Sequence, residues 1–261
     1  MSCASFEISP IGFFECKEIY TYDVPRQGTL AGDNIGVIRL LPDMGFEQAL
    51  YRLDSFSHIW VLFIFNRNTD WRPMILPPRH TTHKVGVFAS RSPYRPSGIG
   101  MCCVKLLGVK GLEVHVQGHD LLDGTPIIDI KPYLPYADSF PDATPGWTGE
   151  KEAEYIVRFT AAAEAQIEWL EEHGVACLRQ FILDRLGTSP LDRRRNRLCP
   201  DMDGLHVLAY RTWRALFSVE ESTVTVSSIR SGYTTEELAS SDDKYGDKQL
   251  HRMFPFSVDA K

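Results

Sequence analysis

The first 135 residues form a succession of short apolar segments, each bounded by Gly, Pro, Asn or Asp. Short strands with frequent turn residues are typical of a β-sandwich or a β-barrel, because each strand buries its apolar side only within a larger sheet. Strands are expected at residues 8–14, 36–40, 59–65, 84–89, 101–107 and 112–117. One helix is expected at residues 46–53. The N-terminal half is therefore predicted to be mainly β.

A proline-rich segment follows this half. Residues 132–149 read PYLPYADSFPDATPGWTG, and their four prolines disfavour regular structure and indicate an extended linker. Beyond it, helical spacing predicts helices at residues 155–173 and 175–186. Alternating segments at 207–217 and 223–229 predict a β-hairpin. The chain is thus divided into an N-terminal β domain (1–138), a linker (139–150), a small α+β C-terminal domain (151–230) and a polar, solvated tail (231–261).

Composition limits where such a chain can work. The longest strongly apolar run, residues 59–65, is far shorter than the roughly twenty residues of a membrane helix. Glu7 and Pro10 interrupt the opening residues, which argues against a secretory signal. Six cysteines without a C-x-x-C pair indicate reduced thiols. We therefore expect a soluble, cytoplasmic protein without a membrane segment.

Charge argues against bulk attraction to nucleic acid. The 28 Lys and Arg residues are outnumbered by 34 Asp and Glu, which gives a net charge of −6. A local basic cluster nevertheless stands out at Arg193, Arg194, Arg195 and Arg197. Guanidinium groups this close together are suited to phosphates, although a solvated loop has the same pattern.

Several common catalytic signatures are absent from the sequence. There is no G-x-G-x-x-G, no G-x-x-x-x-G-K-[ST], no G-x-S-x-G and no H-E-x-x-H. These absences argue against Rossmann, P-loop, α/β-hydrolase and zincin chemistry. The pairs His80/His83 and His115/His119 have no Cys or carboxylate at a convincing ligand spacing, so no metal is predicted.

Two segments place polar groups beside apolar strands. Residues 84–101, KVGVFASRSPYRPSGIGM, carry Arg91 and Tyr94 in a loop rich in Pro and Gly. Residues 118–136, GHDLLDGTPIIDIKPYLPY, place Asp129, Lys131 and Tyr133 at i, i+2 and i+4, hence on one face of a strand. Such groups can bind or activate a polar substrate. An ordinary surface hairpin with a structural salt bridge has the same pattern.

Four strings in these regions resemble the TsaA/TrmO family. They are VPRQG at 24–28, FSHIWVLFIF at 56–65, the RSPYRP loop within 85–101, and DLLDGTPIIDIKPYLPYAD at 120–138. Members of that family are S-adenosylmethionine-dependent methyltransferases that act on threonylcarbamoyladenosine beside the tRNA anticodon. The resemblance covers roughly residues 6–140. It implies an N-terminal closed β-barrel that binds S-adenosylmethionine, a homodimer and a tRNA substrate.

The resemblance also implies site residues. Contacts to the cofactor are expected at Arg26, Gln27, Gly28, Asn66, Arg91, Met101, Leu121, Leu122, Asp123 and Gly124. We further expect Asp129 or Tyr133 to accept the proton of the attacking nitrogen, and Lys131 to polarise the carbonyl or hold the threonyl carboxylate. Arg193, Arg194, Arg195 and Arg197 are expected to hold tRNA phosphates.

The sequence departs from the family pattern at two places. Ser97 and Gly98 stand where the family commonly has Asn-Pro, and TSPLDRRRNR at 188–197 stands where it has D-P-R-P-x-Y. The sequence is therefore also compatible with two other functions. One is a non-catalytic sensor that binds S-adenosylmethionine, and the other is a methyltransferase of a small molecule.

Overall fold

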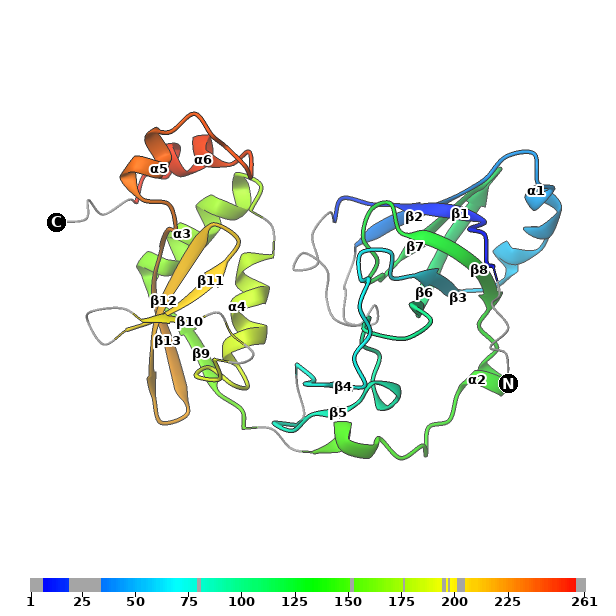
Figure 1. Cartoon of the computed structure of the whole chain (residues 1–261), viewed down its shortest axis with the longest axis horizontal. Helices are drawn as coiled ribbons and strands as arrows, with labels where there is room; N and C mark the ends of the chain where they lie inside the picture. The colour runs from blue at the N-terminus through cyan, green and yellow to red at the C-terminus, as the bar shows by residue number, and fades with distance from the viewer. Residues whose placement is uncertain are drawn as a thin grey trace. The chain divides into compact units, whose positions relative to one another are not determined.

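The computed structural model describes residues 7–18, 34–78, 81–150, 153–175, 177–193, 196, 198–200 and 205–256. The chain divides into two compact units, each described by itself below (Figure 1). One consists of Met1–Pro77 and Thr81–Gly149, and the other consists of Glu150–Lys261 together with Pro78–His80. No helix in the described part of the chain is both long and apolar enough to span a membrane.

The N-terminal unit is a closed barrel of six antiparallel strands (Figure 1). Around the barrel the order is β1-β2-β7-β6-β3-β8, and β8 closes it by pairing with both β3 and β1. The strands are β1 (Gly12–Glu15), β2 (Ile35–Leu40), β3 (His58–Ile64), β6 (Ile99–Lys110), β7 (Glu113–Gln117) and β8 (Pro126–Pro132). The prediction of a mainly β protein with a closed barrel is confirmed.

Alternation along the strands builds the core of the barrel. In β3, Ile59, Val61 and Phe63 are buried while the residues between them lie on the outer face. Full burial of one such side chain contributes about 1.5–3 kcal/mol. Helix α1 (Phe46–Ala49) and the 3-10 turn η2 (Leu53–Ser55) replace the longer helix expected at 46–53. Leu50 from this segment is buried in the core.

Gly36 is required because the Phe14 ring occupies the space where a side chain would lie. A Cβ atom built on Gly36 would lie 2.1 Å from Cζ of Phe14. Gly36→Ala is therefore expected to lower the free energy of unfolding by about 1–3 kcal/mol, since extra volume forces a packed core apart. Urea denaturation measures this value. Gly86→Ala is the matched control because its Cβ would have no neighbour within 4 Å, and equal losses in both variants would contradict the argument.

The segment between β3 and β6 is less regular than expected. The predicted strand at 84–89 consists of β5 (Val85–Gly86), paired only with β4 (Met74–Ile75), followed by the 3-10 turn η3 (Val87–Ala89). After the barrel, the proline-rich segment contains α2 (Pro135–Asp138) and the 3-10 turn η4 (Gly146–Gly149).

The C-terminal unit contains a five-stranded sheet in the order β10-β11-β12-β13-β9. Its strands are β9 (Ile156–Phe159), β10 (Leu198–Pro200), β11 (His206–Tyr210), β12 (Trp213–Glu220) and β13 (Thr223–Ser231). Helices α3 (Ala161–Glu172) and α4 (Leu178–Leu186) pack against this sheet and against each other. β12 and β13 form the expected antiparallel pair.

Two predictions for this unit were wrong in detail. The helix expected from residue 155 begins only at Ala161, because residues 156–159 form β9 parallel to β13 and Thr160 caps the helix by accepting a hydrogen bond from the Ala163 backbone N–H. The segment expected to be continuous at 207–217 reverses at Arg211, whose φ of 52° makes the turn between β11 and β12.

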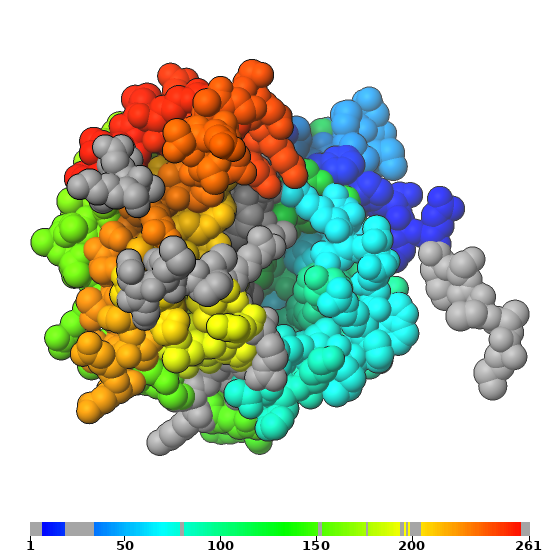
Figure 2. Space-filling model, turned by 60° about the vertical axis from the view of Figure 1, so that its left-hand side comes forward, coloured from blue at the N-terminus to red at the C-terminus, as the bar shows by residue number. Residues whose placement is uncertain are grey.

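The segment expected to be a solvated tail is partly buried. It contains α5 (Thr235–Ala239) and α6 (Lys248–Met253), seen in orange and red in Figure 2. His251 is buried and stacks on Trp213 with ring centroids 3.8 Å apart. Its ring nitrogens are hydrogen-bonded to the hydroxyls of Thr212 and Ser231. These contacts, which anchor α6 to the sheet, join residues far apart in the sequence.

Candidate functional site

The loop between β7 and β8 holds the DLLDG string and is fixed to the end of β1. The Asp123 backbone N–H donates to Glu18 O at 2.9 Å, and its Oδ1 accepts from the Cys16 N–H at 3.1 Å. The Gly124 N–H donates to Phe14 O at 2.8 Å. Gly124 has a φ of +74°, a conformation that favours glycine. Four of the expected cofactor residues, Leu121 to Gly124, therefore lie in one rigid loop, with Leu121 buried.

A second segment, which follows β3, reaches the same loop. Asn66 comes two residues after β3 and is exposed. The guanidinium of Arg67 donates to the backbone oxygen of Asp123 at 3.0 Å. Asn66 is the chain neighbour of this arginine. Arg67 itself was missed from the sequence because it lies outside the recognised strings.

Arg91 lies close to a buried carboxyl group that was also missed. Burial raises the pKa of the Asp120 carboxyl above its ordinary value, while the Cys102 thiol and the positive charge of Arg91 oppose the rise. Among the described residues, Asp120 Oδ1 is buried and makes no hydrogen bond. Asp120 opens the DLLDG string, so its position in that motif was the signal that could have identified it. The charge of Arg91 thus acts on the carboxyl group that opens the DLLDG string.

Asp120 gives the protein a specific pH dependence. The folded protein holds the Asp120 proton more tightly than the unfolded chain, so this group lowers the free energy of unfolding as the pH rises above about 3.9. Asn does not ionise and removes that loss. We expect Asp120→Asn to gain stability relative to the wild type as the pH rises above about 4, as measured by urea denaturation. A pH-independent difference between the two proteins would contradict a raised pKa.

The other arginine of this loop shapes the backbone. Arg95 Nη1 donates to the backbone oxygens of Val87 and Ser90 at 3.1 and 2.7 Å. The guanidinium of Arg72 lies over the Tyr94 ring, 4.4 Å from its centroid. Tyr94 and Arg95 thus fold the loop that carries Arg91. Figure 2 shows this region, in cyan, as a broad part of the surface of the N-terminal unit.

Met101, Asp129, Lys131 and Tyr133 lie on the outer face of the barrel rather than in the β7–β8 loop. Leu62 of β3 pairs with Met101 of β6 on one side and with Asp129 of β8 on the other. Met101 is 48% exposed. We call this face of β8, β3 and β6 the outer wall.

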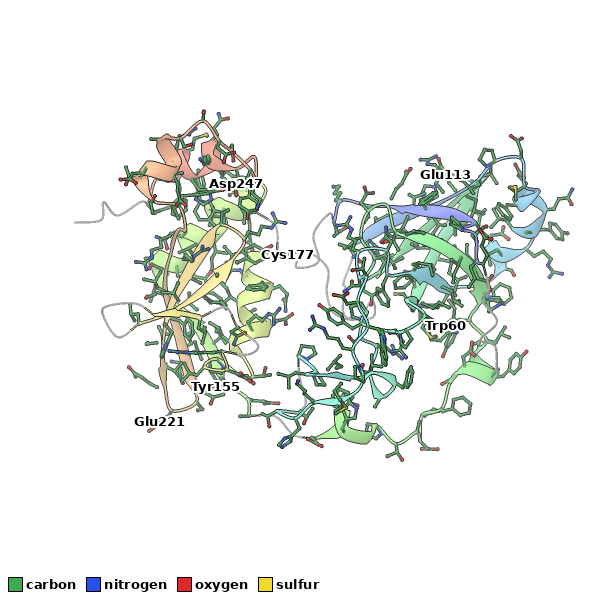
Figure 3. The ribbon with its side chains drawn as sticks, viewed as in Figure 1. Trp60, Glu113, Tyr155, Cys177, Glu221 and Asp247 are labelled. Atoms are coloured by element: carbon green, nitrogen blue, oxygen red, sulfur yellow. The ribbon has the colours of Figure 1, made fainter. Side chains whose placement is uncertain are left out.

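The expected catalytic residues are adjacent on the outer wall. Lys131 Nζ lies 2.7 Å from Asp129 Oδ2, and both side chains are substantially exposed. The Tyr133 ring lies beside Trp60, with centroids 5.9 Å apart. Trp60 is fixed by a hydrogen bond from its Nε1 to Asp138 Oδ2 at 3.0 Å (Figure 3). The three groups therefore share one solvent-accessible surface.

The remaining expected site residues are only partly described. Arg26, Gln27, Gly28, Arg194, Arg195 and Arg197 lie outside the described residues. Arg193 is exposed.

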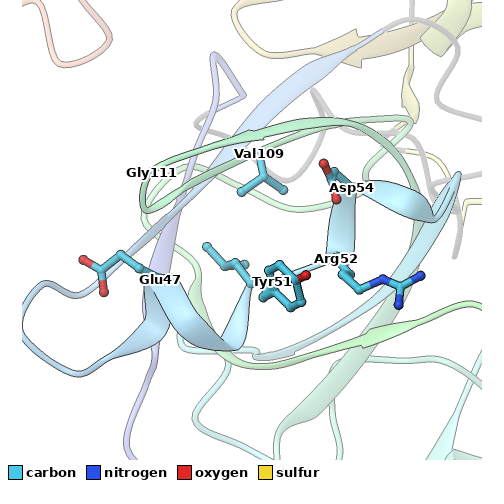
Figure 4. A pocket seen from close by; sticks show the side chains of 7 residues that line it. Glu47, Tyr51, Arg52, Asp54, Val109 and Gly111 are labelled. Carbon is cyan, nitrogen blue, oxygen red and sulfur yellow. The ribbon is translucent and has the colours of Figure 1, made fainter.

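A cavity of about 520 Å³ lies at the opposite end of β7 (Figure 4). Val109 and Gly111 border it where the β6–β7 hairpin turns, whereas the DLLDG loop follows the other end of β7. Glu47, Leu50, Tyr51, Arg52 and Asp54 complete its lining. None of these is an expected site residue.

One group of possible metal ligands was not visible in the linear spacing. His119 has no Cys or carboxylate at a convincing ligand spacing in the sequence, yet Cys16 and Glu18 lie beside it in space. Their ligand atoms and a ring nitrogen of His119 all lie within 4.8 Å of one another. Burial raises the pKa of the Cys16 thiol to about 12. Linear spacing failed here because about one hundred residues separate β1 from the β7–β8 loop.

Comparison with known proteins gives consistent relatives. Residues 16–139 match the family model of the tRNA-methyltransferase O N-terminal domain. The "tRNA (adenine(37)-N6)-methyltransferase" of Escherichia coli (strain K12) is 37% identical over 195 residues, which cover 72% of this chain and 83% of that protein. A Pyrococcus abyssi protein named "Probable S-adenosyl-L-methionine-binding protein" is 36% identical over 53% of this chain and 73% of its own length.

A solved structure agrees over most of the chain. The crystal structure of TrmO from Pseudomonas aeruginosa superposes with a TM-score of 0.56 at 29% identity. The alignment covers 87% of this chain and 98% of the other. The similarity therefore extends beyond the barrel.

Proposed function

This chain belongs to the tRNA-methyltransferase O family, and we propose that it transfers a methyl group from S-adenosylmethionine to N6 of threonylcarbamoyladenosine next to the tRNA anticodon. The enzyme class and the cofactor follow from family membership. The observation that carries the assignment is the match over 83% of the E. coli relative together with the closed barrel. The threonylcarbamoyl group is the more specific part of the proposal.

The charges at the end of the barrel fit the methyl donor. S-adenosylmethionine carries a sulfonium, an ammonium and a carboxylate. The buried Asp120 oxygen without a hydrogen bond within the described chain matches a cationic group, and Arg91 matches a carboxylate. We assign donor binding to Arg91, Asn66 and the loop of Leu121 to Gly124, with Met101 at the edge of the outer wall. Arg26, Gln27 and Gly28 are assigned to the same site from the family motif.

Asp129, Lys131 and Tyr133 are assigned to the transfer step. N6 attacks the methyl carbon, the carbon–sulfur bond breaks, and the electron pair stays on sulfur while the N6 proton leaves. The N6 lone pair is shared with the purine and the carbamoyl carbonyl, so loss of the proton during attack assists the reaction. Asp129 or Tyr133 accepts that proton, and Lys131 holds the threonyl carboxylate or polarises the carbonyl. The exposure of these groups on the outer wall suits a macromolecular substrate.

The two units have different roles in this proposal. Residues 1–138 are the donor-binding barrel, 139–150 a linker, and 151–230 a small α+β domain that contacts RNA. The enzyme acts in the cytoplasm as a homodimer and without a catalytic metal. Analytical ultracentrifugation tests the dimer, and a monomer at micromolar concentration would contradict it.

The basic cluster gives a prediction for RNA binding. Replacing Arg193, Arg194, Arg195 and Arg197 together with Ala is expected to weaken tRNA binding and to reduce the slope of log K against log salt by about 3. Donor binding should not change, since the cluster belongs to the C-terminal unit. Filter binding over a salt series and calorimetry measure the two quantities. Unchanged tRNA affinity at physiological salt would remove the cluster from the RNA site.

One assay separates this function from its two alternatives. The protein is incubated with methyl-labelled S-adenosylmethionine and bulk tRNA, and the tRNA is digested to nucleosides. We expect label in N6-methylated threonylcarbamoyladenosine. Donor binding without any methylated product would support a sensor, and product formed without tRNA would support a small-molecule methyltransferase. Label in adenosine without a threonylcarbamoyl group would contradict the proposed substrate but not the tRNA methyltransferase activity.

A further inference from the structure

Three potential metal ligands come together where β1 leaves the barrel. Cys16 and Glu18 follow β1, and His119 precedes the DLLDG loop. His119 Nε2 lies 3.8 Å from Glu18 Oε2. The three donor atoms lie within 4.8 Å of one another. The cluster adjoins the DLLDG loop assigned above to donor binding, since the Cys16 N–H donates to Asp123 Oδ1 and the Cys16 thiol donates to Leu121 O.

His119 is the observation that points to a ligand. Its side chain is fully buried, and neither ring nitrogen makes a well-aligned hydrogen bond within the described residues. Glu18 Oε2 is buried and lacks such a bond as well. An imidazole and a carboxylate oxygen without well-aligned hydrogen bonds are costly in a protein interior, because each loses its hydrogen bonds to water. A bound cation would satisfy both.

The His119 ring is held in place before any ligand arrives. Its backbone is fixed on both sides, since the His119 N–H donates to Asn34 Oδ1 and the Asn34 Nδ2 donates to His119 O. The ring packs edge-on against Phe14, with centroids 4.6 Å apart. Burial lowers the pKa of His119, which favours the neutral imidazole that binds metals. The folded protein therefore positions the His119 ring before a metal binds.

We propose that Cys16, Glu18 and His119 form a binding site for Zn²⁺. A thiolate, an imidazole and a carboxylate suit this borderline metal, and three protein ligands with a water as the fourth give its tetrahedral geometry. Zinc–ligand distances of about 2.0–2.3 Å place tetrahedral ligand atoms about 3.3–3.6 Å apart, so small side-chain movements close the site. Binding replaces the Cys16 proton, which is released to solvent. The ion would tie the end of β1 to the DLLDG loop.

The test uses the full-length protein, purified without a metal-affinity tag and treated with a chelator. Zn²⁺ is added back and measured by mass spectrometry after desalting, with an expected stoichiometry of roughly one ion per chain. Co²⁺ is the spectroscopic probe, and a thiolate-to-cobalt charge-transfer band is expected on its addition. Zn²⁺ should also raise the melting temperature in a concentration-dependent manner. A wild-type protein that binds neither ion, with no band and no thermal shift, overturns the site.

Variants identify the ligands. Cys16→Ser, Glu18→Gln and His119→Leu are each expected to lose the retained ion, and Cys16→Ser also the cobalt band. Cys103→Ser is the matched control, because this half-buried thiol lies on the outer wall away from the cluster. Circular dichroism verifies folding of each variant. Equal metal retention in folded Cys16→Ser and in the wild type contradicts the proposal. Metal retention is measured without tRNA or donor. A protein that binds no metal would therefore contradict the zinc site and leave the proposed methyltransferase function unaffected.

Discussion

Asp129→Asn is expected to lower the single-turnover rate of tRNA methylation by about 10²–10⁴-fold, the usual contribution of a general base. Asn keeps the size of the side chain but cannot accept the N6 proton. Because Asp129 lies on the outer wall, paired with Lys131, the fold of the barrel and the dissociation constant of the donor should both be retained. The measurement is a quench-flow experiment with saturating donor and tRNA.

Two controls define the meaning of that result. Asp142→Asn removes an exposed carboxylate from the linker and should leave the rate unchanged. Tyr133→Phe removes the other proposed proton acceptor and should have the smaller effect. A wild-type rate for Asp129→Asn together with a large loss for Tyr133→Phe would transfer the role of base to the tyrosine. Wild-type rates for both variants would show that neither residue of the outer wall accepts the proton.

Arg91→Ala is expected to raise the dissociation constant of S-adenosylmethionine by roughly 10–100-fold, in line with about 1.5–3 kcal/mol for a hydrogen bond to a charged group. The substitution removes one of the groups that oppose the raised pKa of Asp120 and, in the proposal, the partner of the donor's carboxylate. Isothermal titration calorimetry measures the change. Arg158→Ala, which removes an exposed arginine from β9, should bind the donor like the wild type. Tight binding by Arg91→Ala would exclude this residue from the site.

The fold was predictable where local pattern determines the structure. Alternation identified the strands that contain Ile38, Val61 and Val104, because each strand has one face in the core. Closure of the barrel depends on pairing between β1 and β8, which lie at opposite ends of the domain in the sequence. Local pattern does not show such a pairing, so closure was expected only from the family resemblance. The burial of His251 and Phe254 in a polar segment was not predictable, because their partners lie in a distant strand.

Site residues were predictable from the sequence only where they fall within a recognised motif. The DLLDG string identified the loop of Leu121 to Gly124, but Arg67 and Asp120 gain their importance from contacts that form only in the folded chain. The Cys16, Glu18 and His119 cluster was missed for the same physical reason.

The most direct test of the account is where the methyl donor binds. The full-length protein is irradiated with methyl-labelled S-adenosylmethionine under ultraviolet light, digested, and the labelled peptides are identified by mass spectrometry. The account predicts label in residues 85–101 or 118–125, with competition by unlabelled donor. Competed label confined to residues 44–55, which border the cavity at the opposite end of β7, would contradict it.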